Sequence, residues 1–472
     1  MKINSLYIKD YNILQDFQIE FSSNLSVLIG ENGSGKSSIM ECIAYIFGHL
    51  HKYFVLNDRT SEFIDGYRIN YSINELDVYI ESRYAQSDTN TFNPIIQING
   101  KDVSINQLKR DFPDYSFLPN KVVMSYSGIT KHLEELNLHF EKKYIQKIIR
   151  QNNPFSLNPL ILPSDNPFIY IKDEYVSFIL LALFVLNTDE ANALIDSLGI
   201  DINGCTTTIT LKKPYWAKSN TEKNNTTNVW GVSGKIAQDL FDGLNTIAIY
   251  KDIEDVQNIF KYELYGAIMI RDLFTYYNLD SSQVLSFLDT LLCDDLLESV
   301  NIVWNSVFSV DKLSEGEKQI ILSVGLSLVL NKSNILFLLD EPDVSLHPKL
   351  QQEFLNNFTK GLNEDSMAII TSHNPIIIGN SNREDIHIIK NGQEMENEYY
   401  SRGRDINSLL YDYFNIHERN SFGEDLIKRF YNAMNNKNYE LAENILTKLR
   451  TAFGDDDIEV IKADSMFDDL AE

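Results

Sequence analysis

The stretch VLIGENGSGKSS, residues Val27–Ser38, decides the fold prediction for this 472-residue chain. Within it, Gly30–Ser37 matches the phosphate-loop pattern G-x-x-x-x-G-K-[ST]. Its glycines let backbone N–H groups approach an anion closely, because no Cβ blocks the path. Lys36 is expected to face the β and γ phosphates of a nucleotide, and the Ser37 hydroxyl to bind Mg²⁺. The residues expected to bind the nucleotide are Glu31, Asn32, Gly33, Ser34, Gly35, Lys36, Ser37 and Ser38.

The flanks of this stretch favour a phosphate site over a simple glycine-rich turn. The apolar run LSVLIG precedes the loop, and SIMECIAYIFGHL after it has apolar residues at helical spacing. A buried strand is therefore expected to lead into a loop that opens a helix. The unpaired N–H groups and the positive dipole end of such a helix favour phosphate.

A second motif, ILFLLDEP at Ile335–Pro342, is a continuous apolar run that ends in two carboxylates. This is typical of a buried parallel strand that delivers acids to its C-terminal end. Asp340 is expected to hold Mg²⁺ through water, and Glu341 to act as general base on the attacking water. A helix cap is the alternative for this pattern alone, but the phosphate loop upstream favours the catalytic interpretation.

The segment KLSEGEKQ, Lys312–Gln319, resembles the signature L-S-G-G-x-x-Q of the ABC-type ATPases. With glutamate in its third position, the segment resembles the signature of the branch that includes the DNA-repair and chromosome-structure ATPases. The resemblance implies that the chain binds ATP with Mg²⁺. It also implies that Ser314 and Gly316 contact ATP held by a second copy, so that a dimer sandwiches the nucleotide. Ser314 and Glu317 also have the spacing of a helix capping box, and both roles can hold together.

The remaining motifs follow in family order. Asp343 in EPDVSLHP matches the D-loop of the ABC-type ATPases. His373 in AIITSHNP stands where the family keeps a histidine that contacts the γ-phosphate, so the resemblance implies a catalytic role for it. The Q-loop glutamine of the family has no counterpart. The best location, VVMSYSG at Val122–Gly128, contains none, and Tyr126 or Ser127 is expected to occupy that place.

Alternating strand-like and helix-like stretches predict an α/β protein. The expected architecture is an ABC-type ATPase head with a phosphate-loop sheet and a β-rich subdomain, interrupted by a helical insertion and followed by a C-terminal helical segment. The expected parts are an N-terminal ATPase lobe at 1–128, a mostly helical insertion at 129–300, a C-terminal ATPase lobe at 301–395 and a helical partner-interaction segment with an acidic tail at 396–472.

The C-terminal part carries a further resemblance. SRGRDINSLLYDYFNIHERN, Ser401–Asn420, and the helices after it resemble the end of the ATPase subunit of Septu-type anti-phage systems. Those systems include versions encoded beside retron reverse transcriptases. The resemblance implies a multimeric ATPase that regulates an HNH-type nuclease partner, with a retron reverse transcriptase and its nucleic acid as a further partner.

Four alternatives remain open from the sequence. An overcoming-lysogenization-type protein would carry a β/α metal-binding nuclease unit after the ATPase, but GDDDIE at Gly454–Glu459 is better explained as an acidic interaction tail. An ATPase of that type could also work with a separate nuclease. A RecF-like DNA-repair ATPase would act on DNA without a nuclease partner, and a nucleotide-dependent scaffold would hydrolyse little ATP.

Composition limits the partners and the compartment. The net charge of −26 opposes uniform coating of DNA, although it leaves a local DNA contact open. The basic stretch EKKYIQKIIR, Glu141–Arg150, is interpreted as a solvated helix face. Cys42, Cys205 and Cys293 have no metal-type spacing. No secretory leader opens the chain, and its apolar runs are too short to span a membrane, so a cytoplasmic location is expected.

Overall fold

The computed structural model describes residues 1–57, 65–82, 94–125, 166–215, 230, 235–254, 259–293, 295–414 and 420–468. Internal contacts divide the chain into two compact units, Met1–Gly403 and Arg404–Glu472. This division falls a few residues after the boundary expected at residue 395. No helix among the described residues is both long and apolar enough to cross a membrane.

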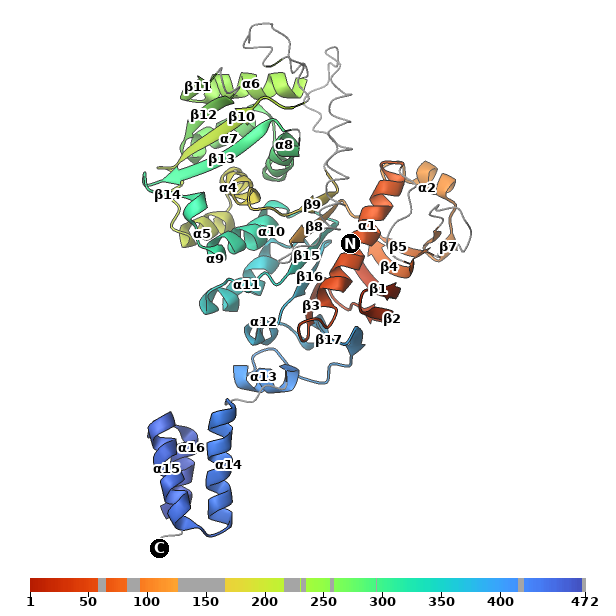
Figure 1. Ribbon diagram of the computed structural model, residues 1–472. Helices are drawn as coiled ribbons and strands as arrows, with labels where there is room; N and C mark the ends of the chain where they lie inside the picture. Colours follow the sequence, from red (N-terminus) through yellow and green to blue (C-terminus); the bar gives the residue numbers. More distant parts are fainter. Residues whose placement is uncertain are drawn as a thin grey trace. The chain divides into compact units, whose positions relative to one another are not determined.

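A seven-stranded, largely parallel sheet forms the centre of the first unit (Figure 1). Its strand order is β18-β17-β3-β16-β15-β8-β9, and β17 and β18 pair in the antiparallel sense. Every residue of β15 and β16 is buried, which explains their unbroken apolar sequences. The strands are β3 (Leu25–Ile29), β8 (Lys121–Ser125), β9 (Phe168–Tyr170), β15 (Ile335–Asp340), β16 (Met367–Thr371), β17 (Ile386–Lys390) and β18 (Gln393–Met395).

Helix α1 (Lys36–Phe54) shares one core with the parallel sheet and with a six-stranded antiparallel sheet. Leu6 of the antiparallel sheet, Phe47 of α1 and Leu338 of the parallel sheet belong to this core. Because α1 is buried on more than one side, its sequence is apolar on more than one face. The second sheet contains β1 (Lys2–Tyr11), β2 (Leu14–Glu20), β4 (Asp65–Ile73), β5 (Leu76–Ser82), β6 (Ile95–Ile98) and β7 (Lys101–Asp102), and α2 (Ile105–Asp111) follows it.

The middle of the chain contains a five-stranded antiparallel sheet, so the expectation of a mostly helical insertion was incomplete. Its strand order is β11-β12-β10-β13-β14. In β10, threonine occupies both buried positions (Thr207 and Thr210) and partly exposed ones (Thr206 and Thr208), so its sequence lacks the usual contrast between apolar and charged positions. The strands are β10 (Thr206–Lys212), β11 (Tyr250–Glu254), β12 (Ile259–Tyr265), β13 (Leu297–Trp304) and β14 (Phe308–Ser309); β13 crosses the boundary expected at residue 300.

Five helices accompany this sheet in the described part of the middle segment. The most apolar, α4, is buried along most of its length and packs against α7, α8 and the helical turns that follow the signature segment. Its apolar sequence therefore reflects burial inside the protein. The helices are α4 (Tyr175–Leu186), α5 (Asp189–Ser197), α6 (Lys235–Ile247), α7 (Gly266–Tyr276) and α8 (Ser281–Cys293).

The signature segment forms a helix with one wide turn. After the 3₁₀ turn η1 (Val310–Lys312), the chain forms α9 (Glu315–Ile320), the π-helical turn η2 (Ile321–Gly325) and α10 (Leu326–Val329). Figure 1 shows α10, α11 (Pro348–Gly361) and α12 (Pro375–Asn380) on the side of the parallel sheet opposite α1. A short 3₁₀ turn, η3 (Arg383–Asp385), precedes β17.

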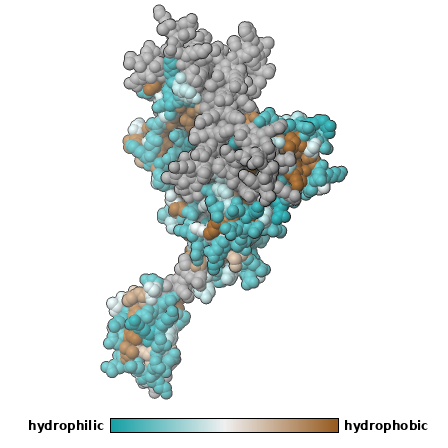
Figure 2. All heavy atoms as spheres, turned by 45° about the vertical axis from the view of Figure 1, so that its right-hand side comes forward, coloured by the Kyte–Doolittle hydropathy of each residue, from teal (hydrophilic) through white to brown (hydrophobic). Residues whose placement is uncertain are grey.

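The second unit is helical, as the sequence predicts. It contains α13 (Ile406–Phe414), α14 (Ser421–Asn435), α15 (Tyr439–Phe453) and α16 (Ile458–Asp468). Phe430, Leu446 and Val460 belong to a core that the last three helices share. Figure 2 shows some hydrophobic surface on this unit among hydrophilic side chains. The acidic residues of GDDDIE lie in the turn between α15 and α16 and at the start of α16.

Candidate functional site

The predicted phosphate loop connects the end of β3 to the start of α1, as the sequence analysis expects. Gly30, Gly33 and Gly35 have φ angles of +152°, +77° and +112°. A Cβ at Gly30 would lie 2.1 Å from the carbonyl oxygen of Ile389, a distance that no side chain permits. Gly30 is therefore required for the close approach of this loop to β17.

Two turns from distant parts of the sequence hold the loop. The backbone N–H of Gly392, in the β17–β18 turn, donates to the carbonyl of Ser34 at 2.8 Å. On another side, a Cβ at Gly35 would lie 3.0 Å from Leu14 and 3.1 Å from Ile13, both at the β1–β2 turn. One backbone hydrogen bond and two closely packed side chains thus support the loop conformation.

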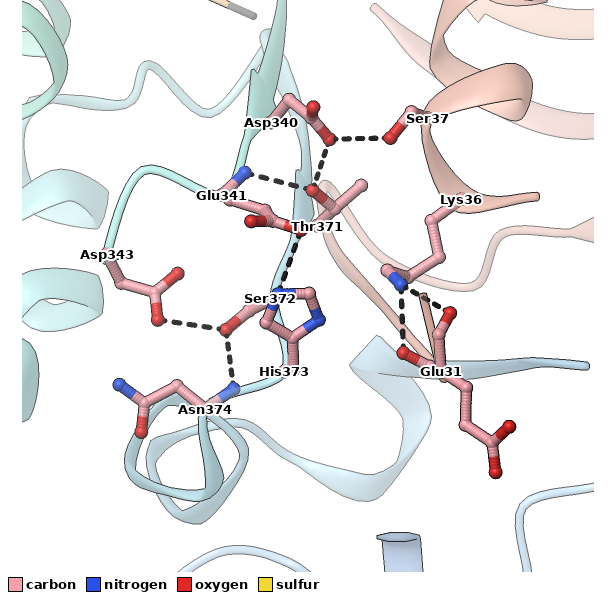
Figure 3. Close-up of polar contacts among 11 residues, drawn as sticks. Glu31, Lys36, Ser37, Asp340, Glu341, Asp343, Thr371, Ser372, His373 and Asn374 are labelled. Carbon is pink, nitrogen blue, oxygen red and sulfur yellow. Dashed lines mark hydrogen bonds and ion pairs between the residues drawn. The ribbon is translucent and has the colours of Figure 1, made fainter. Parts of the chain in front are cut away.

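Lys36 is the first residue of α1, and its side chain is buried. Its Nζ donates to the carbonyl oxygens of Gly30 at 2.8 Å and Glu31 at 3.1 Å, within the loop itself (Figure 3). Burial lowers the pKa of Lys36, while the nearby carboxylates of Glu341 and Asp340 act in the opposite direction. A cation therefore lies at the centre of the loop, near Asp340 at the end of β15 and Glu341 directly after it.

A chain of hydrogen bonds joins α1 to the ends of β15 and β16. The Ser37 hydroxyl donates to Oδ1 of Asp340 at 3.1 Å, and the Thr371 hydroxyl donates to the same oxygen at 2.6 Å. The Thr371 hydroxyl also accepts from the backbone N–H of Glu341 at 2.9 Å. Figure 3 shows these residues converging between the loop and the two strands. Thr371 thereby connects both predicted acids.

Glu341 and His373 form the exposed end of this arrangement. His373 Nε2 lies 2.9 Å from Glu341 Oε1, and both side chains are partly accessible. Glu341 has a φ of +49°, an unusual conformation for glutamate that its backbone hydrogen bond to Thr371 helps to maintain. The two predicted catalytic residues therefore lie side by side next to the loop.

Asp343 lies behind this pair and is nearly fully buried. Burial raises its pKa, while hydrogen bonds from Ser372 and Asn374 act in the opposite direction. The Ser372 hydroxyl donates to Asp343 Oδ2 at 3.0 Å and accepts from the Asn374 backbone N–H at 3.0 Å. Asp343 therefore fixes the start of its own loop against the segment that carries His373.

The signature residues show their helix-capping role directly. The Ser314 side chain accepts from the backbone N–H of Glu317 at 3.3 Å, and the Ser314 N–H donates to the Glu317 carboxylate at 2.7 Å. This is the predicted capping box. A Cβ at Gly316 would lie 2.6 Å from the carbonyl oxygen of Ser345, so Gly316 allows close contact with the D-loop.

The signature and the phosphate loop do not meet within one chain. In Figure 1, α9 lies at the left of the first unit, apart from β3 and α1, which flank the phosphate loop. The structure thus brings together Lys36, Ser37, Asp340, Glu341 and His373. It places Ser314 and Gly316 elsewhere on the same unit.

The residues of the loop fit a magnesium–nucleotide ligand. Glu31, Asn32 and Gly33 are exposed at its tip, where they are accessible to a ligand. The Ser34 Oγ is buried without a hydrogen-bond partner among the described residues. The Ser37 hydroxyl and the Asp340 carboxylate are oxygen donors of the kind that Mg²⁺ prefers. Ser38 Oγ accepts from the Asn12 side chain at 3.3 Å, which joins this end of the loop to the β1–β2 turn.

A family profile described as AAA ATPase domain matches residues 1–378. The chain belongs to this family. The AAA ATPase domain thus covers the phosphate loop, the signature, the paired acids and His373, and it ends before the second unit. This membership supports ATP as the nucleotide of the loop.

Parts of the chain are similar to curated proteins named DNA replication and repair protein RecF. The protein from Oenococcus oeni is 34% identical over 23% of this chain and 26% of its own length. The protein from Actinobacillus pleuropneumoniae serotype 5b is 27% identical over 28% of this chain and 36% of its own length. The protein from Clostridium perfringens strain 13 is 26% identical over 35% of this chain and 47% of its own length. The chain therefore spans less than half of the length of each of these relatives.

Solved structures with similarity to the chain include an SMC head bound to the C-winged helix domain of ScpA. It is 13% identical, covers 85% of this chain and 97% of its own, and has a TM-score of 0.36. A structure of RecF with ATP is 14% identical, covers 84% and 98%, and also has a TM-score of 0.36. The SMC head domain from Thermotoga maritima is 14% identical, with coverages of 84% and 97% and a TM-score of 0.32.

Sequence reasoning missed Thr371 and Ser372, which organise the three predicted acids. Both lie in the motif AIITSHNP, directly before His373. The position of hydroxyl residues at the end of a strand parallel to β15 is the signal that could have identified them. The Q-loop candidates Tyr126 and Ser127 and the basic stretch Glu141–Arg150 lie outside the described residues.

Proposed function

We propose that two copies of this chain sandwich ATP and hydrolyse it, and that this assembly regulates a separate HNH-type nuclease in an anti-phage complex. The observation that carries the ATPase proposal is the hydrogen-bonded connection from Ser37 through Asp340 and Thr371 to the backbone of Glu341. It places a phosphate-loop hydroxyl and two acids in one rigid arrangement. Such preorganisation is what phosphoryl transfer requires of a protein.

In this proposal the residues of one chain bind ATP and prepare water for attack. Lys36 exchanges its loop carbonyl partners for the β and γ phosphates, and the loop N–H groups bind the phosphate oxygens. Ser37 and Asp340 hold Mg²⁺, which when bound neutralises phosphate charge. Glu341 accepts a proton from the attacking water, and His373 orients its carboxylate through their 2.9 Å contact.

The second chain supplies the signature. Ser314 and Gly316 lie at the N-terminus of α9, whose first-turn N–H groups favour phosphate and whose Ser314 hydroxyl would exchange its Glu317 partner for the nucleotide. This helix end lies apart from the phosphate loop of its own chain (Figure 1). A two-fold arrangement would bring each signature to the loop of the other copy. Hydrolysis would then depend on dimerisation, and ATP would act as a clamp on assembly.

Mixing two inactive variants tests the two-chain site. Lys36→Ala should lose nucleotide binding, and Ser314→Arg should bind ATP but block the opposed site. In the mixture, some dimers combine an intact loop with an intact signature, so a fraction of the ATPase activity should return. Lys36→Ala mixed with Lys36→Ala,Ser314→Arg is the matched control that should stay inactive. A mixture as inactive as this control would contradict the proposal.

The nuclease partner is supported by the C-terminal resemblance and by the separately folded second unit, whose helices have their own core. An HNH-type nuclease encoded beside this chain should co-purify with it when both are expressed from the native operon. Comparing the nuclease activity of that complex with and without Glu341→Gln would show whether bound ATP restrains or activates the partner. The ATPase eluting alone would count against the proposal.

A RecF-like role in DNA repair is the second candidate, and the local similarity to RecF proteins favours it. In that case the chain alone should bind duplex DNA or DNA ends with ATP, and DNA should stimulate its ATPase activity. ATPase activity that does not respond to DNA, together with a nuclease partner, would favour the defence role.

A further inference from the structure

The turn between β13 and β14 exposes apolar side chains at a tight bend. Asn305 and Ser306 have φ angles of +51° and +57°, and the N–H of Val307 donates to the Trp304 carbonyl at 3.3 Å. This is the backbone of a compact turn with two left-handed residues, a position where polar residues are usual. Val307 is nevertheless 62% exposed and Phe308 54% exposed.

This turn lies beside the signature. The Lys312 ammonium donates to the Val307 carbonyl at 2.8 Å, two residues before Ser314. The D-loop lies on another side of the signature, because Gly316 contacts Ser345. Its residue Val344 is 61% exposed. We call Val307, Phe308 and Val344 the signature rim.

An exposed apolar side chain also lies beside the phosphate loop. Ile13 is 43% exposed, although its Cγ2 lies 3.1 Å from the Cβ position of Gly35. In a two-fold dimer that joins signature to phosphate loop, the signature rim of each copy faces the phosphate-loop side of the other copy, so the same contact forms twice. Apolar groups on both halves of the site are therefore positioned to meet. The net charge of −26 on each chain makes two copies repel, and apolar contacts would offset this repulsion without adding charge.

We infer that the signature rim packs against the phosphate-loop side of a second copy, around Ile13, and anchors the ATP-sandwiched dimer. This inference rests on the proposed function and adds the β13–β14 turn and the β1–β2 turn, which lie outside the nucleotide motifs, to the interface. Because Phe308 belongs to the edge strand β14 and Val307 to the turn before it, this edge of the inserted sheet would contact the second copy directly. The middle segment would then form part of the interface that assembles with ATP.

The Val307→Asp substitution tests the anchor in a Glu341→Gln parent, which is expected to hold ATP. Sedimentation equilibrium with ATP should give a dimer dissociation constant at least tenfold weaker than that of the parent. ATP binding to the monomer should stay unchanged, because Val307 is not in the phosphate loop. Tyr215→Asp is the matched control. Tyr215 is 77% exposed and follows the opposite end of β10 from the end that pairs with Val303, so its substitution should leave the dimer within twofold of the parent.

A second measurement is independent of the folding of Val307→Asp. Chains carrying Val307→Cys and chains carrying Ile13→Cys, both in the parent background, are mixed and treated with a short bismaleimide. An ATP-dependent cross-link between the two kinds of chain is expected. If the parent dimerises with ATP but Val307→Asp dimerises equally tightly, or if the cross-link does not form, the inference is wrong. If the parent itself does not dimerise with ATP, the proposed two-chain site fails first.

Discussion

The imidazole of His373 contacts the carboxylate of Glu341, with 2.9 Å between Nε2 and Oε1. The two residues follow the ends of β16 and β15, which are parallel neighbours. The Glu341 backbone is held from the same side, because its N–H donates to the Thr371 hydroxyl. The proposed base is therefore oriented through both its backbone and its side chain, which reduces the reorganisation needed for catalysis.

Replacing the base should separate ATP binding from hydrolysis. Glu341→Gln keeps the shape of the side chain but cannot accept a proton, so the hydrolysis rate should fall by about 10²–10⁴-fold. ATP binding should persist, and the dimer should become more stable because its nucleotide is not consumed. Glu353→Gln, at an exposed position on α11, is the control and should leave the rate unchanged. Turnover by Glu341→Gln at the wild-type rate would exclude Glu341 as the base.

Thr371 is expected to act as a positioning residue. Thr371→Val removes the hydroxyl that joins Asp340 to the Glu341 backbone but keeps the side-chain shape. The kcat should fall by about tenfold, in line with the loss of a hydrogen bond to a charged group, while KM for ATP changes little. Thr371→Ser should restore most of kcat. A valine variant that loses thermal stability but keeps kcat would indicate a purely structural role.

The contact between the signature and the D-loop should depend on Gly316. In Gly316→Ala, the new methyl group would meet the Ser345 carbonyl at 2.6 Å, so α9 or the D-loop must shift. ATP binding should remain, since the phosphate loop is untouched, whereas hydrolysis should be largely lost. Glu315→Ala, at an exposed neighbouring position on α9, controls for the change in helix propensity. Equal hydrolysis rates in the two variants would show that the close contact is not needed.

The stability of the protein should depend on pH through His51. Burial lowers the pKa of His51 from 6.5 to about 4, although the backbone of Pro119 acts in the opposite direction. Between these two pH values the unfolded chain binds a proton that the folded chain does not. The free energy of unfolding should therefore fall as the pH drops from 6.5 to 4, by up to about 3 kcal/mol from this residue.

Chemical denaturation of the wild type and of His51→Phe over this pH range measures the effect. The difference in the free energy of unfolding between wild type and His51→Phe should be constant above pH 7. Below pH 7 it should change steadily, because phenylalanine does not titrate. His347→Asn, at an exposed helix cap, should follow the wild-type curve. A difference that stays constant from pH 7 to pH 4 would contradict the assignment.

The features predicted correctly from sequence depend on residues that are close along the chain. The strand–loop–helix around Lys36 follows from an apolar run, three glycines and a helical period. The capping box of Ser314 and Glu317 needs only a three-residue spacing. The buried strand that ends in Asp340 and Glu341 is equally local.

The sheet formed by β10–β14 was missed because helix α6 separates β10 from β11, and helices α7 and α8 separate β12 from β13. In β10, threonines at both buried and partly exposed positions also hide the alternation of the strand. Pairing of β10 with β13 joins residues about ninety positions apart, and no local pattern encodes that register.

By itself, the sequence determined that this chain contains a phosphate loop, a signature helix and a pair of acids at the end of a buried strand. Each of these depends on the chemistry of one short segment. Only the tertiary structure decided that Thr371 joins Asp340 to Glu341 and that the signature lies apart from the phosphate loop of its own chain. Those relationships depend on which strands become neighbours. Burial of the whole core selects that arrangement, and no single segment specifies it.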